Sequence, residues 1–189
     1  MVHTVKPPTE VDYDSSSFKI FLGGTIDMGN SFDWQADLAE KLDHLDGVTL
    51  LNPRRDIWKT FWEQTADSPE FRGQVEWELE GLENANLIVI YLAPGSMSPI
   101  SLLELGLFAG TKRVLVCCPE GFYRKGNIDI VCQRYGITQV PTYNELIVSL
   151  ERIILFELAS RSVESMIKPI DMLNNGVADN DTEPHSYAQ

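Results

Sequence analysis

Residues 87–110 of the chain read LIVIYLAPGSMSPISLLELGLFAG, and this stretch decides the fold. Its first six residues form a continuous apolar run, which is typical of a strand covered on both faces in a parallel sheet. The next six, APGSMS, are mostly turn residues, and residues 99–109 have the composition of a helix that begins at a proline. A buried strand, a loop and a helix in this order predict one β–α unit of an α/β protein.

The same alternation extends in both directions from this stretch. Four further strands are predicted at residues 18–22, 48–51, 113–117 and 138–140, and four further helices at 32–44, 70–83, 127–135 and 143–158. Because a helix that joins two strands of one sheet forms a right-handed βαβ unit, all five strands are expected to be parallel. The sequence therefore predicts a single doubly wound, flavodoxin-like α/β domain, with a five-stranded parallel sheet flanked by helices.

The two ends of the chain lack the apolar periodicity of the middle. Residues 1–17 are polar, and residues 168–189 contain four acidic side chains and no Lys or Arg beyond Lys168. Segments of this composition cannot bury enough apolar surface to offset the entropy of ordering. We expect a flexible N-terminal segment at 1–17, a folded domain at 18–167 and an acidic flexible tail at 168–189.

The charge of the chain argues against two classes of partner. Its 189 residues include 28 Asp or Glu and 15 Lys or Arg, so the formal net charge is −13. This charge repels phosphate backbones and anionic lipids, so we expect neither nucleic acid nor a membrane to be the main partner. No apolar run approaches the roughly 20 residues that span a bilayer, and residues 1–17 do not resemble a signal peptide.

The cysteines and histidines are few and unfavourably placed for metal or redox chemistry. Cys117, Cys118 and Cys132 show no CxxC or CxxH spacing, which favours a reducing, cytoplasmic location. The three histidines lie in the two ends and on one predicted helix surface. We therefore expect no metal site and no cofactor, and chemistry that depends on carboxylates.

Ligands of doubly wound sheets bind beyond the carboxyl ends of the strands, and this rule selects the candidate binding residues. They are Gly23, Gly24, Thr25 and Asp27 after the first strand, Asn52, Arg54 and Arg55 after the second, and Ser98 after the third. The glycines allow close backbone approach to a ligand, although a tight turn explains them equally well. The two arginines present a fork for a phosphate or carboxylate, or else form salt bridges with Asp56 or the acidic helix that follows.

Glu104 stands out because almost everything around it is apolar. Between residues 100 and 108 only Ser101, Glu104 and Gly106 are not apolar. A carboxylate in such a helix is costly unless it faces a functional site or pairs with a cation, here Arg113. Gly106 weakens a helix relative to alanine, which indicates close packing at that position.

Taken together, these segments resemble the nucleoside 2-deoxyribosyltransferase superfamily. The resemblance is carried by FLGGT at 21–25, LIVIYL at 87–92, SMSPIS at 96–101 and LLELGLFAG at 102–110, and it covers about residues 18–150. NPRRD at 52–56 and QVEWELE at 74–80 are similar to a branch described as deoxyribosyltransferase-like. The superfamily includes deoxyribosyltransferases and nucleoside 5′-monophosphate N-glycoside hydrolases.

The resemblance assigns roles to particular residues. It implies that Glu104 is the nucleophile that attacks the anomeric carbon and carries the sugar, and that Glu78 lies where transferases have an acidic residue beside the nucleobase. Gly23, Gly24 and Thr25 fall on the first substrate loop. Ser98 departs from the pattern, because transferases have a further active-site aspartate at that place. The resemblance also implies a nucleoside or nucleotide as the ligand and a homo-oligomer in which a neighbouring subunit completes the site.

The chemistry of carboxyl groups supports the roles of Glu104 and Glu78 independently of the resemblance. Breaking an N-glycosidic bond creates an oxocarbenium-like centre that an ionised carboxylate can trap, while a second acidic group protonates the leaving base. We therefore expect an enzyme that cleaves or transfers at this bond, with Glu104 as nucleophile and Glu78 as acid. Two alternatives remain open: a non-catalytic nucleotide-sensing module, favoured by Ser98, and an NAD-type glycohydrolase.

Overall fold

The structure is a computed structural model that describes residues 1–26, 31–56 and 63–175, with side chains described up to residue 165. The chain divides into two compact units, Met1–Ile154 and Leu155–Gln189. The first unit contains the whole sheet and the candidate site, and the second contains the C-terminal part of the last helix. No helix within the described ranges is long and apolar enough to cross a membrane.

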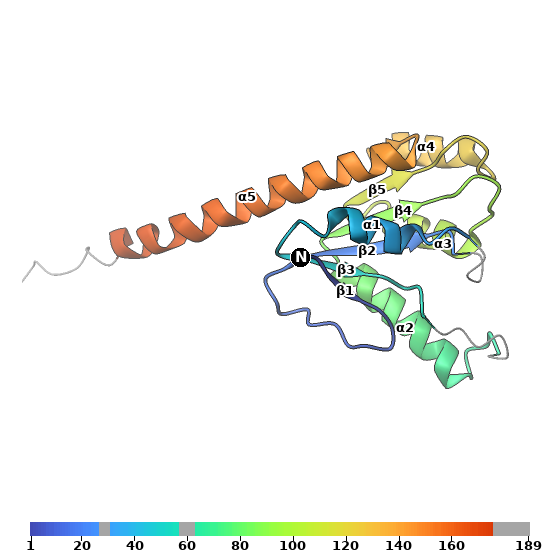
Figure 1. The fold of residues 1–189 in the computed structure, drawn as a ribbon, viewed down its shortest axis with the longest axis horizontal. Helices are drawn as coiled ribbons and strands as arrows, with labels where there is room; N and C mark the ends of the chain where they lie inside the picture. The colour runs from blue at the N-terminus through green and yellow to red at the C-terminus, as the bar shows by residue number, and fades with distance from the viewer. Residues whose placement is uncertain (27–30, 57–62, 176–189) are drawn as a thin grey trace, which may run out of the picture. The chain divides into compact units, whose positions relative to one another are not determined.

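From β2 onward, strands and helices alternate along the described chain (Figure 1). The elements are β1 (His3–Val5), β2 (Phe18–Gly24), α1 (Trp34–Leu42), β3 (Val48–Leu51), α2 (Pro69–Asn84), β4 (Leu87–Tyr91), α3 (Pro99–Phe108), β5 (Val114–Cys117), α4 (Lys125–Tyr135), β6 (Thr138–Val140) and α5 (Tyr143–Asn175). The strands form one sheet in the order β1-β3-β2-β4-β5-β6, and every neighbouring pair is parallel. The predicted doubly wound α/β fold is confirmed.

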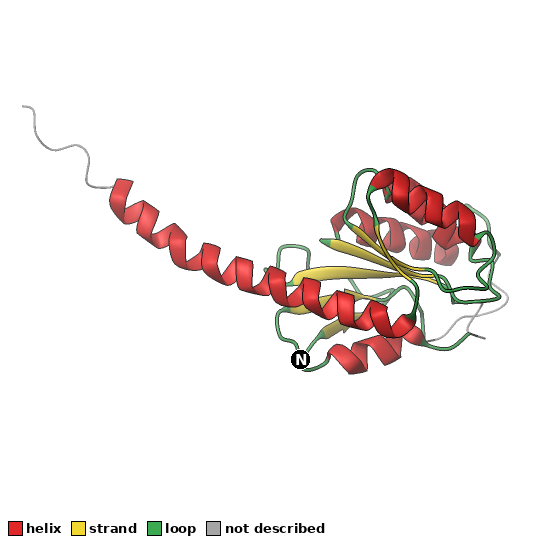
Figure 2. Cartoon of the chain, turned by 90° about the horizontal axis from the view of Figure 1, so that it is seen from above, coloured by secondary structure: helices red, strands yellow, loops and turns green. Residues whose placement is uncertain are grey.

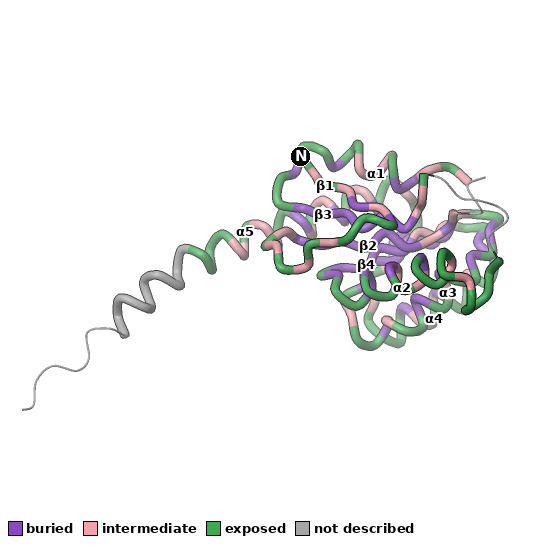
Figure 3. The backbone as a smooth tube through the Cα atoms, turned by 90° about the horizontal axis from the view of Figure 1, so that it is seen from below, coloured by how far each residue is buried: buried purple, intermediate pink, exposed green. Residues whose placement is uncertain are grey.

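The helices cover both faces of the sheet (Figure 2). In the first unit, α2, α3 and α4 lie on one face and α1 on the other (Figure 3). Side chains alternate between these faces along each strand. On β4, Ile88 and Ile90 belong to the core cluster shared with α2, α3 and α4. Tyr91 instead contacts Trp34 of α1 and Tyr143 at the start of α5.

One strand comes from a segment that was predicted to be a flexible end. His3–Val5 pairs with β3, so the described sheet has six strands where five were expected. Val5 is buried, and the indole nitrogen of Trp77 donates to the carbonyl oxygen of Thr9 at 2.8 Å. A three-residue edge strand is held mainly by backbone hydrogen bonds, which leave no periodic signal in the sequence.

The last helix is longer than predicted. It continues to Asn175, so the first eight residues of the predicted acidic tail, 168–175, are helical. The remaining residues of that tail, 176–189, lie outside the described residues. Beyond residue 158 the chain contains good helix formers such as Ala159, Arg161 and Glu164. The prediction ended the helix at residue 158 because it was based on apolar periodicity, to which these residues do not contribute.

Candidate functional site

The candidate site lies where the chain reverses its direction of winding through the sheet. From β2 the chain passes through α1 to β3 on one side, and α2 then returns it to β4 on the other side of β2. The carboxyl ends of β2 and β4 therefore border the crevice in which open α/β sheets bind ligands. Gly23 is the last residue but one of β2 at this edge, and α3, which follows the loop after β4, brings Glu104 to it.

Gly23 makes room for the carboxyl group of Glu104. It lies on the same face of β2 as Phe21, two residues earlier, and this face is covered by α2 and α3. A Cβ atom on Gly23 would lie only 3.2 Å from Oε2 of Glu104. The glycine predicted to approach a ligand therefore approaches the candidate nucleophile.

Glu104 occupies a poorly solvated position. Only 8% of the residue is exposed, and no ion pair between described residues includes it. The ion pair with Arg113 that the sequence left open is therefore not formed. Burial raises the pKa of Glu104 to about 8, and the neighbouring charge of Glu78 contributes to this increase. A carboxylic acid in this condition is a functional-site candidate.

Glu78 is held by side chains from two segments. Oε1 of Glu78 accepts a hydrogen bond from Nε2 of Gln74 at 2.6 Å, and Nε of Arg55 donates to the amide oxygen of Gln74. Burial raises the pKa of Glu78, while the Gln74 hydrogen bond and the Arg55 charge act in the opposite direction. The pKa of Arg55 is lowered by burial, and the charge of Glu78 limits this effect. Arg55 thus lies beside a candidate catalytic carboxyl.

The two arginines do not form the fork that the sequence suggested. Arg54 donates to the carbonyl oxygens of Ser31 at 3.2 Å and Phe32 at 3.4 Å, and its Nε lies 3.5 Å from Asp33 Oδ2. Arg55 turns instead toward α2, because successive side chains leave the backbone in different directions. Asn52 is buried, and its Oδ1 accepts a hydrogen bond from the backbone nitrogen of Arg54 at 2.9 Å. Asp27, also predicted to bind substrate, lies outside the described residues.

Three buried hydroxyl groups join the loops after β2 and β4. Oγ1 of Thr25 lies 2.9 Å from Oγ of Ser96 and 2.7 Å from Oγ of Ser98, and the two serine oxygens are 3.0 Å apart. Ser96 donates its proton to the carbonyl oxygen of Ala93, so only two protons remain for the three contacts. Thr25 and Ser98, both predicted to bind substrate, therefore also serve to hold the two loops together. Ser98 adopts the left-handed conformation, with φ 42°.

Gln74 and Ser96 also belong to the candidate site, although the sequence analysis did not single them out. Gln74 lies four residues before Glu78, so both side chains lie on one side of α2. This spacing in QVEWE was a usable signal. Within the described part of the chain, no group of three or more His, Cys, Asp or Glu side chains is arranged to hold a metal ion.

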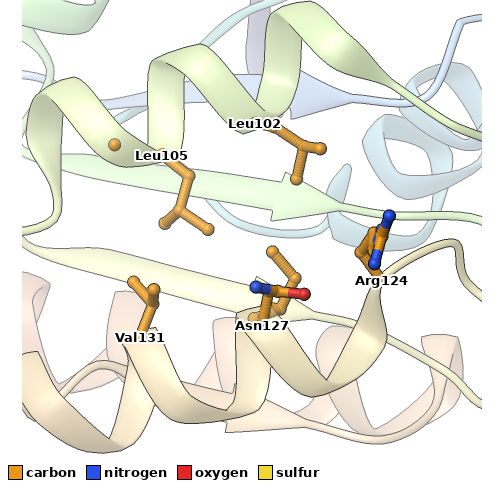
Figure 4. Close-up of a pocket in the computed structure, with 7 residues that line it drawn as sticks. Leu102, Leu105, Arg124, Asn127 and Val131 are labelled. Carbon is orange, nitrogen blue, oxygen red and sulfur yellow. The ribbon is translucent and has the colours of Figure 1, made fainter.

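Gly106 does not pack closely against anything. A Cβ atom there would meet no heavy atom within 4 Å, so the close packing expected from the sequence is wrong. Gly106 instead lines an open groove of about 360 Å³ between α3 and α4. Figure 4 shows Leu102 and Leu105 of α3 on one side of this groove and Asn127 and Val131 of α4 on the other.

Replacing Gly106 by alanine is expected to stabilise the protein by about 0.5–1 kcal/mol. The new methyl group has space, and alanine reduces the conformational entropy of the unfolded chain within a helix. Urea unfolding of the two proteins measures the difference in free energy. A loss of stability would show that the groove closes over this position.

Comparisons with known proteins find similarity over the part of the chain that contains the candidate site. A family model described as nucleoside 2-deoxyribosyltransferase like matches residues 17–122, which include Gly23, Glu78, Ser98 and Glu104. Among solved structures, the chain is similar to the crystal structure of a conserved protein from Enterococcus faecalis V583. The TM-score is 0.51 and the identity 12%, over 72% of this chain and 98% of that chain, so the likeness concerns the fold. None of the curated proteins matches the chain.

Proposed function

The chain belongs to the nucleoside 2-deoxyribosyltransferase-like family, and from this premise we propose that it cleaves or transfers at the N-glycosidic bond of a nucleoside or nucleoside 5′-monophosphate. The family supports glycosyl transfer or hydrolysis in general. The observation that carries the specific proposal is a pair of carboxyl groups, the buried Glu104 and the half-buried Glu78, on two helices that cover the same face of the sheet.

The pair is suited to hold one proton for the reaction. Burial raises the pKa of both carboxyl groups, and the charge of Glu78 raises the pKa of Glu104 further, so the pair retains a proton where an isolated glutamate would lose it. A leaving nucleobase requires one proton, and a nucleophilic carboxylate must have none. The raised pKa of Glu104 places this proton on Glu104 in the free protein, so the proposal requires that it pass to Glu78 when the substrate binds; the pair then meets both requirements.

The proposed reaction has two steps. In the first, a carboxylate oxygen of Glu104 bonds to the anomeric carbon, the carbon–nitrogen bond breaks, and its electron pair leaves with the base while Glu78 supplies the proton. In the second, water or another base attacks the same carbon and releases Glu104, and Glu78 accepts the proton that this attack sets free. Gly23 contributes by leaving the space that the Glu104 carboxyl occupies.

One observation favours a nucleotide-sensing module as the second candidate. The resemblance implies that Ser98 stands where transferases have an aspartate, and the Ser98 hydroxyl lies within the cluster with Thr25 and Ser96. A hydroxyl group cannot supply the charge or the acid–base chemistry of a carboxylate at that place. Such a protein would bind its ligand on the same edge of the sheet without breaking the bond.

Chromatographic detection of free base distinguishes these candidates. The protein is incubated with nucleosides, deoxynucleosides and their 5′-monophosphates, each with and without a second base. We expect free base from at least one substrate, and a new nucleoside in the presence of the second base if the acceptor is not water. A rise in melting temperature with a ligand that never releases its base would favour the sensing module and contradict the enzyme.

A further inference from the structure

Gln74 connects two charged side chains that come from different segments. It lies four residues before Glu78 on α2, and only 3% of it is exposed. Its Nε2 donates to the carbonyl oxygen of Pro53 at 2.9 Å and to Oε1 of Glu78 at 2.6 Å. Its Oε1 accepts a hydrogen bond from Nε of Arg55. Both N–H groups and the oxygen of the amide are therefore engaged.

These partners permit only one orientation of the Gln74 amide. A guanidinium group only donates, and the Pro53 carbonyl group only accepts. Turning the amide by 180° would place oxygen against oxygen at Pro53 and nitrogen against nitrogen at Arg55. The remaining N–H is thus directed at Oε1 of Glu78. Because Oε1 accepts this hydrogen bond, a proton carried by the Glu78 carboxyl belongs on Oε2.

We propose that Gln74 is a positioning residue that confines the transferable proton of Glu78 to Oε2. The inference rests on the proposed function, in which Glu78 protonates the leaving base. A proton that always occupies the same atom is delivered along a fixed direction, and orientation of this kind contributes substantially to rates. Gln74 reaches the reaction only through Glu78, and Arg55 and Pro53 anchor it from the segment after β3.

The groups around Glu78 determine whether its pKa rises or falls when the Gln74 amide is removed. From the segment after β3 it faces the positive charge of Arg55, from α2 the amide of Gln74, and from α3 the carboxyl group of Glu104. An N–H that donates to a carboxylate favours the ionised form and lowers its pKa. Removing the Gln74 amide is therefore expected to raise the pKa of Glu78 and to free the carboxyl group to rotate.

Gln74→Leu tests this inference, and Gln74→Met provides a second variant if the first does not fold. Gln139→Leu is the matched control, because Nε2 of Gln139 also donates to a carboxylate, Asp129 Oδ1 at 2.6 Å, outside the candidate site. Titration of the side-chain carboxyl carbons by ¹³C NMR reports the pKa of Glu78 without turnover. The Glu78 signal is assigned by its absence in Glu78→Gln.

We expect the pKa of Glu78 to rise in both Gln74 variants and to stay unchanged in Gln139→Leu. With a substrate found by base release, kcat is expected to fall roughly 10- to 100-fold in the Gln74 variants, with little change in KM. The activity that requires protonated Glu78 is then lost at a higher pH than in the wild type. A purely structural role would lower the melting temperature without moving this pH.

Two results would overturn the inference. The first is an unchanged titration of Glu78 in a folded Gln74 variant, which shows that the amide does not act on the carboxyl group. The second is a raised pKa of Glu78 with unchanged kcat, which shows that the hydrogen bonds from Arg55 through Gln74 to Glu78 do not contribute to catalysis. Failure of the proposed function is recognised separately, by the absence of base release from the wild type. If the proposed function is wrong, the positioning role of Gln74 is wrong as well. The titration of Glu78 still shows whether the hydrogen bond from Gln74 to Glu78 exists.

Discussion

Replacing Glu104 by glutamine is expected to reduce base release by about a thousandfold or more, with the protein still folded. An amide has nearly the shape of a carboxyl group, but it cannot act as the anionic nucleophile that traps the anomeric carbon. The change therefore removes the proposed chemistry while it preserves the shape of the side chain beside Gly23. Chromatographic measurement of free base, with substrate in excess, gives the ratio of the two rates.

The same variant provides its own test of folding, because it is expected to be more stable than the wild type. The folded pKa of Glu104 is about 8, against an ordinary value of 4.5. Below pH 4.5 the carboxyl group is protonated in the folded and the unfolded chain, so it costs nothing. As the pH rises, the unfolded chain loses this proton and the folded chain retains it, so wild-type stability falls until about pH 8.

Glutamine does not titrate, so the stability of Glu104→Gln lacks this dependence. At pH 7 the difference corresponds to about 2.5 pH units above the ordinary pKa, or about 3 kcal/mol in favour of the variant. At pH 4 the difference is expected to vanish. Urea unfolding of both proteins across this range measures it, and near-complete loss of turnover in a more stable protein would exclude misfolding as the cause.

Glu83→Gln is the matched control for Glu104→Gln. Glu83 is an exposed glutamate on α2, and the same substitution there removes one negative charge from the surface. We expect neither turnover nor the pH dependence of stability to change. Full turnover by Glu104→Gln would contradict the nucleophile assignment, and equal pH profiles of stability for Glu104→Gln and the wild type would contradict the burial of an acidic group.

The order of strands and helices, and the position of Glu104, were predictable because their signals are local. A continuous apolar run predicts β4, and a single carboxylate in an apolar helix attracts attention whatever surrounds it in space. The confirmed family membership adds weight to the segments around these residues. The edge strand β1 left no comparable signal, because its stability comes from pairing with β3, far along the chain.

The directions of side chains could not be predicted from spacing alone. Arg54 and Arg55 are adjacent in sequence, yet one binds backbone oxygens before α1 and the other binds Gln74 on α2. Gly106 was expected to pack closely, because a glycine in a helix has an energetic cost, but its surroundings are open. In each case a local rule identified an unusual residue, whereas the three-dimensional partners determined what that residue does.

Replacing Gly24 by alanine is expected to destabilise the protein by about 4 kcal/mol, of which about half comes from backbone strain and half from the steric clash. Gly24 has φ 140°, a conformation that side-chain-bearing residues rarely adopt. A Cβ atom there would overlap the carbonyl oxygen of Tyr91 and lie 2.8 Å from its nitrogen. These are backbone atoms of the paired strand β4, so neither can move aside without disturbing the sheet.

Gly95→Ala separates the two contributions. Gly95 also has a positive φ, 77°, but a Cβ atom there would meet no heavy atom within 4 Å, so we expect a loss of only about 1 kcal/mol. Urea unfolding measures both variants under the same conditions. Equal losses would contradict the close approach of the β2 and β4 backbones. This approach forms the edge on which Gly23 and Glu104 meet, and the larger loss would show that the pairing of β2 with β4 at this edge requires a glycine.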